Sequence, residues 1–273
     1  MASALPRPIA FLSDYGYRDP FVGICHSVIA STGPGIQVID LTHGLQAHNV
    51  RAAAIALADA APYLPTGAVV LAVVDPGVGG TRMAIAADTA DGVSLVGPDN
   101  GLLWLAAERL GGVTALAEIS NSAARLQPVS DTFHGRDIFA PVAARIALGD
   151  TLEQLGNSLT PDSITPLDLP VPQLSANTLQ TEVLDIDHFG NVRLCAAADA
   201  LQSTPVKLHT TVEIEASGLR MPALRVATFA DVSSGELLLY EDASGALAIA
   251  VNGGSAAQLL GADRSSTIKL IWT

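Results

Sequence analysis

The chain has 273 residues, of which 49% are hydrophobic and only 15% are charged. Globular domains usually hold about 25% charged residues, so this composition excludes an intrinsically disordered chain and predicts large cores in one or two domains. Lys and Arg number 14 and Asp and Glu number 27, which gives a net charge of −13. Because the sequence has no basic run long enough to follow a phosphate backbone, nucleic acid is not expected as a partner.

The cysteines and the N-terminal residues indicate the compartment. Cys25 and Cys195 are too far apart for a disulfide framework or a paired-cysteine metal site, which is typical of a reducing compartment. The first residues lack the features of a signal peptide, and no apolar run approaches the roughly 20 residues that span a bilayer. We therefore expect a cytoplasmic protein with no membrane partner. A mean hydropathy of +0.39 indicates apolar surface that other subunits cover.

Up to about residue 150, short β-rich runs alternate with alanine- and leucine-rich segments of helical period, which is typical of an α/β sheet covered by helices. Buried strands are expected at residues 8–13, 36–42 and 67–75. Helices are expected at residues 20–32, 48–64 and 101–112, and a hairpin with an Asp-Gly turn at residues 83–101. Residues 135–150 predict a further helix that Pro141 interrupts.

Repeated prolines and polar residues between Thr160 and Leu179 predict a linker between two domains. The α/β domain is expected at residues 1–165 and the second domain at residues 178–273. The second domain has short alternating runs separated by Gly, Ser and Asp, which predicts a smaller all-β, barrel-like fold. Its strands are expected at residues 180–194, 205–216, 224–232, 235–242, 245–252 and 266–273.

Polar residues follow the predicted strands of the first domain, where ligands of open α/β sheets bind. Asp14 follows the first strand, Asp40 and His43 follow the second, and Asp75 follows the third. Each Asp alone is more often a strand-closing turn or a helix cap than a ligand-binding residue.

The segment VVDPGVGGTR at residues 73–82 is more informative, because a glycine-rich turn separates Asp75 from Arg82 and lets backbone approach a ligand closely. Neither GxGxxG nor GxxxxGK[ST] occurs, so a nucleotide-phosphate loop is not supported. In TFHGRDIFAP at residues 132–141, His134 precedes a predicted helix. It is either a cap or core residue, or a group that polarises a water or holds an anion together with Asp75 and Arg82. Spacing alone does not show whether the three residues meet.

Metal binding is the competing hypothesis for the acids and histidines of the N-terminal part, namely Asp14, Asp19, His26, Asp40, His43 and His48. Its support is weak, because HExxH is absent, His43 and His48 stand on a predicted loop, and no cysteine pair closes a site. Neither a metal nor a cofactor is therefore expected. A serine nucleophile has still less support, because GxSxG is absent.

A family resemblance is carried, in order from about residue 8 to 260, by FLSDYG, DLTH, VVDPGVGGTR, GPDNGLL, TFHGRDIFAP, DHFGN and ALAIAVNGGSAA. The chain resembles the S-adenosyl-L-methionine (SAM) hydroxide adenosyltransferase family, also called SAM hydrolases, which are related to fluorinases and chlorinases. The resemblance implies an N-terminal α/β domain, a C-terminal β-barrel and a homotrimer. It also implies that water attacks the ribose C5′ of SAM, which gives adenosine and L-methionine.

The same resemblance implies roles for single residues. Asp75, Arg82 and His134 match the water-activating triad, Asp14 matches the aspartate on both ribose hydroxyls, and Phe133 matches an aromatic residue near the adenosyl group. In the second domain, Asp187 matches the acid on the methionine ammonium, Phe189 and Asn191 match adenine-site residues, and Ser244 falls where the methionine carboxylate binds. Because these two sets stand on either side of the linker, we expect active sites shared between subunits.

Some positions depart from the family or its halogenating relatives. Those relatives carry Arg at the positions of Ser244 and Val251, so Ser244 and backbone donors would bind the carboxylate here. His48 stands where an aromatic residue often covers the ribose. A SAM-dependent halogenase and a non-catalytic SAM- or adenosine-binding module stay open as alternatives. The halogenating relatives have an aromatic residue in place of Asp75 and a hydroxyl in place of Val78, and a carboxylate repels halide, so both differences favour water.

Overall fold

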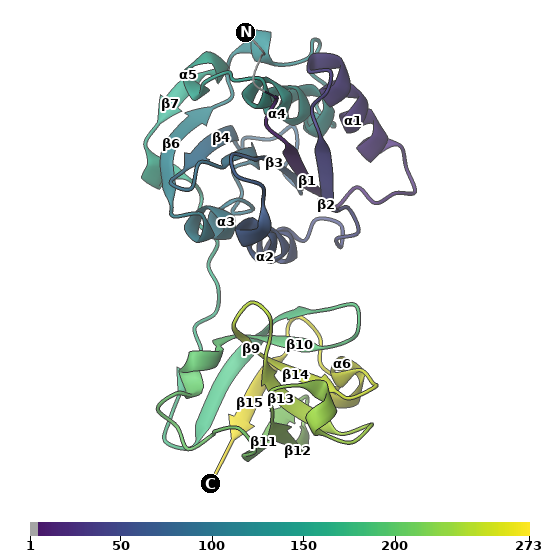
Figure 1. The fold of residues 1–273 in the computed structure, drawn as a ribbon, viewed down its shortest axis with the longest axis vertical. Coiled ribbons are helices and arrows are strands. Elements are labelled where there is room, and N and C mark those ends of the chain that lie inside the picture. Colours follow the sequence, from purple (N-terminus) through teal and green to yellow (C-terminus); the bar gives the residue numbers. More distant parts are fainter. Residues whose placement is uncertain (1–4) are drawn as a thin grey trace. The chain divides into compact units, whose positions relative to one another are not determined.

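The computed structural model describes residues 5–273, which divide into two compact units between Leu167 and Asp168 (Figure 1). The division falls inside the proline-rich stretch at residues 160–179. The first part of that stretch packs on the first unit, because Ile164 is buried and the Thr165 N–H donates to Asp99 Oδ1 at 2.8 Å. Part of the predicted linker therefore packs on the first unit.

The first unit is built on a seven-stranded sheet with the strand order β2-β1-β3-β5-β4-β6-β7. The strands are β1 (Ile9–Ser13), β2 (Val38–Thr42), β3 (Val69–Val73), β4 (Ala84–Thr89), β5 (Ser94–Pro98), β6 (Val113–Glu118) and β7 (Asn157–Leu159). The pairs of β1 with β2 and β3, and of β3 with β5, are parallel, whereas β4, β6 and β7 pair antiparallel. The expected strands and the β4–β5 hairpin are present, and β6 and β7 were not predicted.

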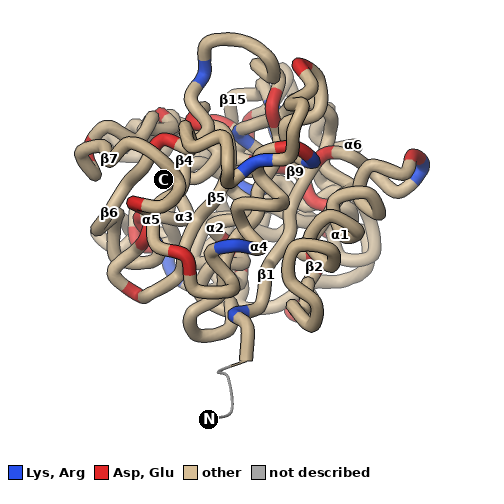
Figure 2. Tube along the Cα trace, turned by 90° about the horizontal axis from the view of Figure 1, so that it is seen from above, with Lys and Arg blue, Asp and Glu red and all other residues tan. Residues whose placement is uncertain are grey.

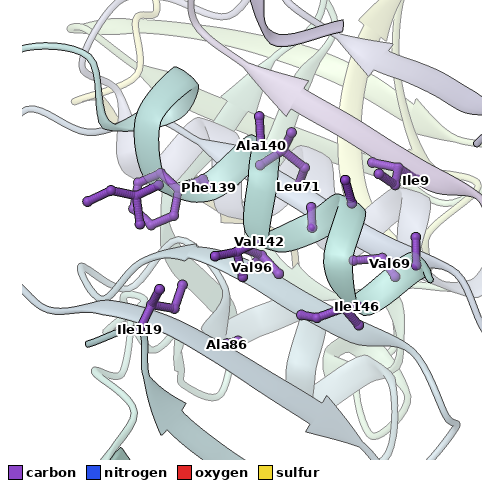
Figure 3. Close-up of a cluster of buried hydrophobic side chains, with 14 of the residues drawn as sticks. Ile9, Val69, Leu71, Ala86, Val96, Ile119, Phe139, Ala140, Val142 and Ile146 are labelled. Atoms are coloured by element: carbon purple, nitrogen blue, oxygen red, sulfur yellow. The ribbon is translucent and has the colours of Figure 1, made fainter. Parts of the chain in front are cut away.

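Helices cover both faces of this sheet, which makes an α/β/α sandwich (Figure 1). They are α1 (Phe21–Thr32), α2 (Val50–Ala60), α3 (Trp104–Arg109), α4 (Ala140–Ala147) and α5 (Leu152–Leu155). Strand side chains alternate between the faces. Figure 3 shows the Leu71 side chain among those of Val142 and Ile146 from α4, whereas its neighbour Ala72 belongs to the cluster on the side of α2 and α3.

The helix expected at residues 135–150 is divided in the structure. Gly135–Phe139 form a single π-helical turn, and α4 then begins at Ala140 with Pro141 in its first turn. Proline has no N–H to donate to the preceding turn, so it fits a helix start and leaves a wider turn before it. This wide turn begins directly after His134 and fixes where that histidine lies.

The second unit contains a closed barrel, as the alternating runs predict. Its strands are β8 (Gln173–Leu174), β9 (Thr178–Ile186), β10 (Val192–Ala197), β11 (Thr211–Ala216), β12 (Leu219–Arg225), β13 (Leu237–Glu241), β14 (Ala246–Val251) and β15 (Thr267–Ile271). The order is β10-β14-β13-β12-β11-β15-β9-β8, and a β10–β9 pairing closes the ring with β8 outside it. The helix α6 (Ala256–Leu260) was not predicted.

The prediction of a strand at residues 224–232 is mostly wrong. Only its first residues belong to β12, and a 3₁₀ turn forms at Phe229–Asp231. The carboxylate of Asp231 accepts from the backbone N–H of Thr228 at 3.1 Å, so a side chain takes the donor that a sheet ladder would need.

Charged residues are distributed in keeping with the acidic composition. Figure 2 shows acidic segments over many loops and strands, with basic segments as separate positions among them. Within residues 5–273, no helix is long and apolar enough to cross a membrane.

Candidate active site

A pocket of about 260 Å³ lies where β1 and β3 end. Its walls come from several segments and include Asp14, Tyr15, Phe21, His48, Asp75, Val78, Thr132, His134 and Gly135. Asp14 follows β1 and Asp75 follows β3 by two residues, so parallel neighbouring strands bring both carboxylates to one sheet edge. Tyr15 and Thr132 were not singled out from the sequence, although each lies beside a candidate residue in FLSDYG or TFHGRD.

Arg82 contacts both Asp75 and His134, two residues that line the pocket. Its Nε donates to the two carboxylate oxygens of Asp75 at 2.9 and 3.1 Å, and its Nη2 also donates to Oδ2. The same Nη2 lies 2.6 Å from Nδ1 of His134. The Asp75 and Arg82 side chains are only 7% and 11% exposed. The structure thus brings together the three residues that spacing alone could not connect.

The contact with Arg82 fixes the tautomer of His134. A guanidinium has only donors, so Nδ1 of His134 accepts the bond and carries no proton. Burial, followed by the positive charge of Arg82, lowers the pKa of His134 below its usual value of 6.5. The ring is therefore neutral at pH 7, with its proton on Nε2.

The glycine-rich turn is what allows Asp75 and Arg82 to meet. The Val78 N–H donates to the carbonyl of Asp75 at 3.2 Å, and Gly79 has a φ of +74°. A side chain at Gly79 would overlap the carbonyl oxygen of Asp131, so the turn packs tightly against the segment that leads to His134. Glycine is required here both for the left-handed backbone and for this close approach.

Asp14 and Phe133 contribute to the pocket in different ways. One oxygen of Asp14, Oδ2, accepts from the backbone N–H of His48 at 2.8 Å, which holds the left-handed His48 over the pocket wall. The Phe133 ring packs edge-on against Tyr15 and Phe21, with centroids 5.7 and 5.2 Å away. Phe133 therefore supports two wall residues from behind.

In the second unit, the candidates Asp187, Phe189 and Asn191 share the loop between β9 and β10. The Oδ1 of Asp187 accepts from the N–H groups of Phe189 and Asn191, both at 2.9 Å, and its Oδ2 accepts from Asn191 Nδ2 at 2.7 Å. The carboxylate thus shapes the loop. Phe189 is left 74% exposed, which is unusual for a large apolar side chain.

Ser244 lies in the turn between β13 and β14, where its N–H donates to Asp242 Oδ1 at 2.9 Å. Arg193 Nε lies 2.7 Å from the other oxygen of Asp242. The register of β10 with β14 pairs Val192 with Ile249 and Ala197 with Ala246. This places the Ser244 turn and the Asp187 loop at opposite ends of one ladder.

Comparisons with known proteins match both units. The family model of the SAM hydroxide adenosyltransferase N-terminal domain matches residues 9–156, and that of the C-terminal domain matches residues 181–269. The chain belongs to the SAM hydroxide adenosyltransferase family. Within it, the chain is 49% identical to the "(R)-S-adenosyl-L-methionine hydrolase" of Salinispora tropica, over 97% of this chain and 98% of that protein.

Two further comparisons describe the range of the family. A fluorinase of Actinoplanes sp. is 27% identical over 89% of this chain and 90% of its own length. A crystal structure of an uncharacterized conserved protein from Thermotoga maritima has a TM-score of 0.91 and 37% identity, and covers 97% of this chain and 100% of that one. The hydrolase-named relative is therefore far more similar to this chain than the fluorinase.

Proposed function

We propose that the protein is a SAM hydrolase that forms adenosine and L-methionine. The observation that carries this proposal is the contact of one buried guanidinium, that of Arg82, with both Asp75 and His134 at the pocket. The high identity to a relative named as a hydrolase supports the same reaction. SAM is the substrate, and no cofactor is part of the proposal.

The proposed reaction is a substitution at the ribose C5′. The oxygen of water forms a bond to C5′ while the C5′–S bond breaks, and the electrons of that bond convert the sulfonium into the neutral thioether of methionine. The water loses one proton. Because the sulfonium is already a good leaving group, the reaction needs an aligned nucleophile more than an acid.

Water is a weak nucleophile, with a pKa of about 15.7, so the residues around it must orient it and stabilise the developing hydroxide. Asp75 retains further lone pairs besides those that Arg82 occupies, and it would accept a hydrogen bond and then the proton of the water. Arg82 holds Asp75 in place and supplies a fixed positive charge. The Nε2–H of neutral His134 would complete the set of donors around the water.

The remaining candidates would bind the substrate. We assign Asp14 to the ribose hydroxyls. Phe133 would lie near the adenosyl group and act through Tyr15 and Phe21, the two wall residues that it packs against. Asp187 would bind the methionine ammonium, and Phe189 and Asn191 would bind the adenine. The family resemblance alone assigns Ser244 to the methionine carboxylate, because ammonium and carboxylate share one carbon and the Ser244 turn lies at the other end of the β10–β14 ladder from Asp187. We also propose a cytoplasmic homotrimer with active sites shared between subunits. The exposed Phe189 and the low share of charged residues support the subunit interfaces, and the buried free thiol of Cys25 supports a reducing compartment.

Products distinguish this function from its alternatives. Purified protein is incubated with each sulfonium epimer of SAM, because the relative's name specifies the (R) configuration, in the presence of fluoride, chloride or neither. With the (R) epimer, we expect adenosine and methionine in equal amounts with fluoride, with chloride and with neither halide. A 5′-halo product would indicate the halogenase, and binding of SAM without any product would indicate the non-catalytic module.

Asp14→Asn is expected to weaken SAM binding about 10- to 100-fold and to change kcat much less. Asn keeps an oxygen that accepts from the His48 N–H, but it loses the charge that two ribose hydroxyls would share, and charged hydrogen bonds contribute about 1.5–3 kcal/mol. Calorimetry on Asp14→Asn and on the exposed control Asp19→Asn measures this effect. A kcat loss with unchanged affinity would contradict the ribose assignment.

The rate is expected to be constant above pH 7 and to fall as the pH drops through the lowered pKa of His134. Protonation puts a proton on Nδ1, which then repels Arg82 in place of accepting from it. The folded state also binds this proton less readily than the unfolded chain does. Neutral His134 therefore stabilises the folded state above about pH 6.5, and this stabilisation is lost as the pH falls. A pH profile of kcat for wild type and for His134→Gln measures this. An identical acid limb in both proteins would contradict the assignment.

A further inference from the structure

A cluster of two histidines and one aspartate lies outside the proposed hydrolytic residues. His26 is on α1, Asp40 is on the edge strand β2, and His43 directly follows β2. Nε2 of His26 lies 2.8 Å from Asp40 Oδ1, and Nε2 of His43 lies 3.1 Å from the same oxygen. One potential ligand atom from each residue lies within 4.8 Å of the other two.

These separations fit a single ion. A tetrahedral Zn²⁺ with bonds of about 2.0–2.1 Å holds its ligand atoms about 3.3 Å apart. The 3.1 Å separation of His43 from Asp40 is close to this value, and the 2.8 Å separation of His26 from Asp40 would widen by about 0.5 Å. Imidazole nitrogens with one carboxylate are a known zinc ligand set that leaves a fourth position for water. His26 and Asp40 side chains are 34% and 31% exposed, so an ion can enter from solvent.

The environment of His43 favours a cation over a simple hydrogen bond. Its side chain is fully buried, its ring packs edge-on against Phe11, and its Nδ1 lies 2.7 Å from Ser13 Oγ. Its Nε2 is buried, and its contact with Asp40 Oδ1 at 3.1 Å is longer than that of His26 and poorly angled for a hydrogen bond. When the Nδ1–H of His43 donates to Ser13, Nε2 carries a lone pair and lies beside the Asp40 carboxylate, so two acceptors face each other. A metal ion between them would bind both the imidazole and the carboxylate.

We propose that His26, Asp40 and His43 bind one divalent transition-metal ion of the Zn²⁺ type. The ion would fasten α1 to the end of β2. It would also hold the segment that leads into the pocket, because the carbonyl of His43 accepts from the Gly16 N–H at 2.7 Å and Ser13 precedes Asp14. This site is separate from Asp75, Arg82 and His134, so it stabilises the pocket without taking part in the hydrolysis.

The test is calorimetric titration of Zn²⁺ into tag-free, chelator-treated protein. We expect one ion per chain, and binding at least about 100-fold weaker in His26→Gln and Asp40→Asn, since loss of even an outer-shell partner costs about 10- to 100-fold. Gln at position 26 can still donate to Asp40, so this variant keeps a purely hydrogen-bonded cluster while it removes a ligand. His209→Asn, which removes an exposed imidazole elsewhere, should bind as wild type does.

Co²⁺ supplies a second readout that is independent of activity. Bound at this site in place of Zn²⁺, it should give the intense visible absorption of a four-coordinate ion in wild type and His209→Asn, and not in His26→Gln. Melting curves with and without Zn²⁺ confirm that each variant is folded. Absence of Zn²⁺ binding to wild type, or equal affinity in His26→Gln, would overturn the proposal and would leave the hydrolase assignment untouched.

Discussion

Asp75→Asn is expected to lower kcat for SAM hydrolysis by about 10²- to 10⁴-fold, the range that general acid–base groups contribute. Asn keeps the shape of the side chain and one oxygen that accepts from Arg82. It cannot take the proton of the attacking water, and its amide group places donors where Arg82 already donates. The ribose and methionine contacts assigned above do not involve Asp75, so the affinity for SAM should change less than about threefold.

Asp150→Asn is the matched control for this experiment. Asp150 is also paired with an arginine, Arg145, at 2.6 Å, but neither residue belongs to the pocket walls. Rates under saturating SAM and calorimetric binding are measured for both variants. If Asp75→Asn abolished SAM binding, or if it kept the wild-type kcat, Asp75 would not be the group that acts on water.

Arg82→Lys is expected to lower kcat by about 10²- to 10³-fold, comparable to the loss of a fixed donor at a developing oxyanion. The guanidinium reaches Asp75 through Nε and His134 through Nη2 at once. A lysine ammonium is a single point and cannot keep both contacts in these positions. The substitution should also destabilise the fold, because Asp75 would remain buried with a poorly placed partner.

Arg145→Lys makes the same substitution in the more exposed Arg145–Asp150 pair and should leave kcat unchanged. Thermal melting measured alongside kcat separates loss of fold from loss of chemistry. Wild-type turnover in folded Arg82→Lys would show that the contact between Arg82, Asp75 and His134 is not needed for the reaction.

Much of the fold follows from hydrophobic patterning. The strands β1 and β3 are fully buried and therefore form continuous apolar runs, and the Asp-Gly turn marks the hairpin of β4 and β5. The short strand β7 and the helix α6 were missed, because three to five residues carry no readable period. The π-helical turn after His134 was seen only as a proline interruption.

The sequence singled out Asp14, Asp75 and His134, which line the pocket, but it did not predict their contacts. Asp75 and Arg82 are joined by a local turn, but His134 comes 52 positions after Arg82, and only the fold brings its Nδ1 to the guanidinium. The same limit explains why the metal hypothesis had little sequence support. His26 and Asp40 come from a helix and a neighbouring strand, so local ligand-spacing motifs do not detect them.

Hydrolysis in water enriched in oxygen-18 tests the central claim most directly. Direct attack of water on the ribose C5′ predicts that the label enters the 5′-hydroxyl of adenosine and that the methionine carries none. Mass spectrometry of both products separates this route from attack at another atom. Unlabelled adenosine would contradict water activation by Asp75, Arg82 and His134.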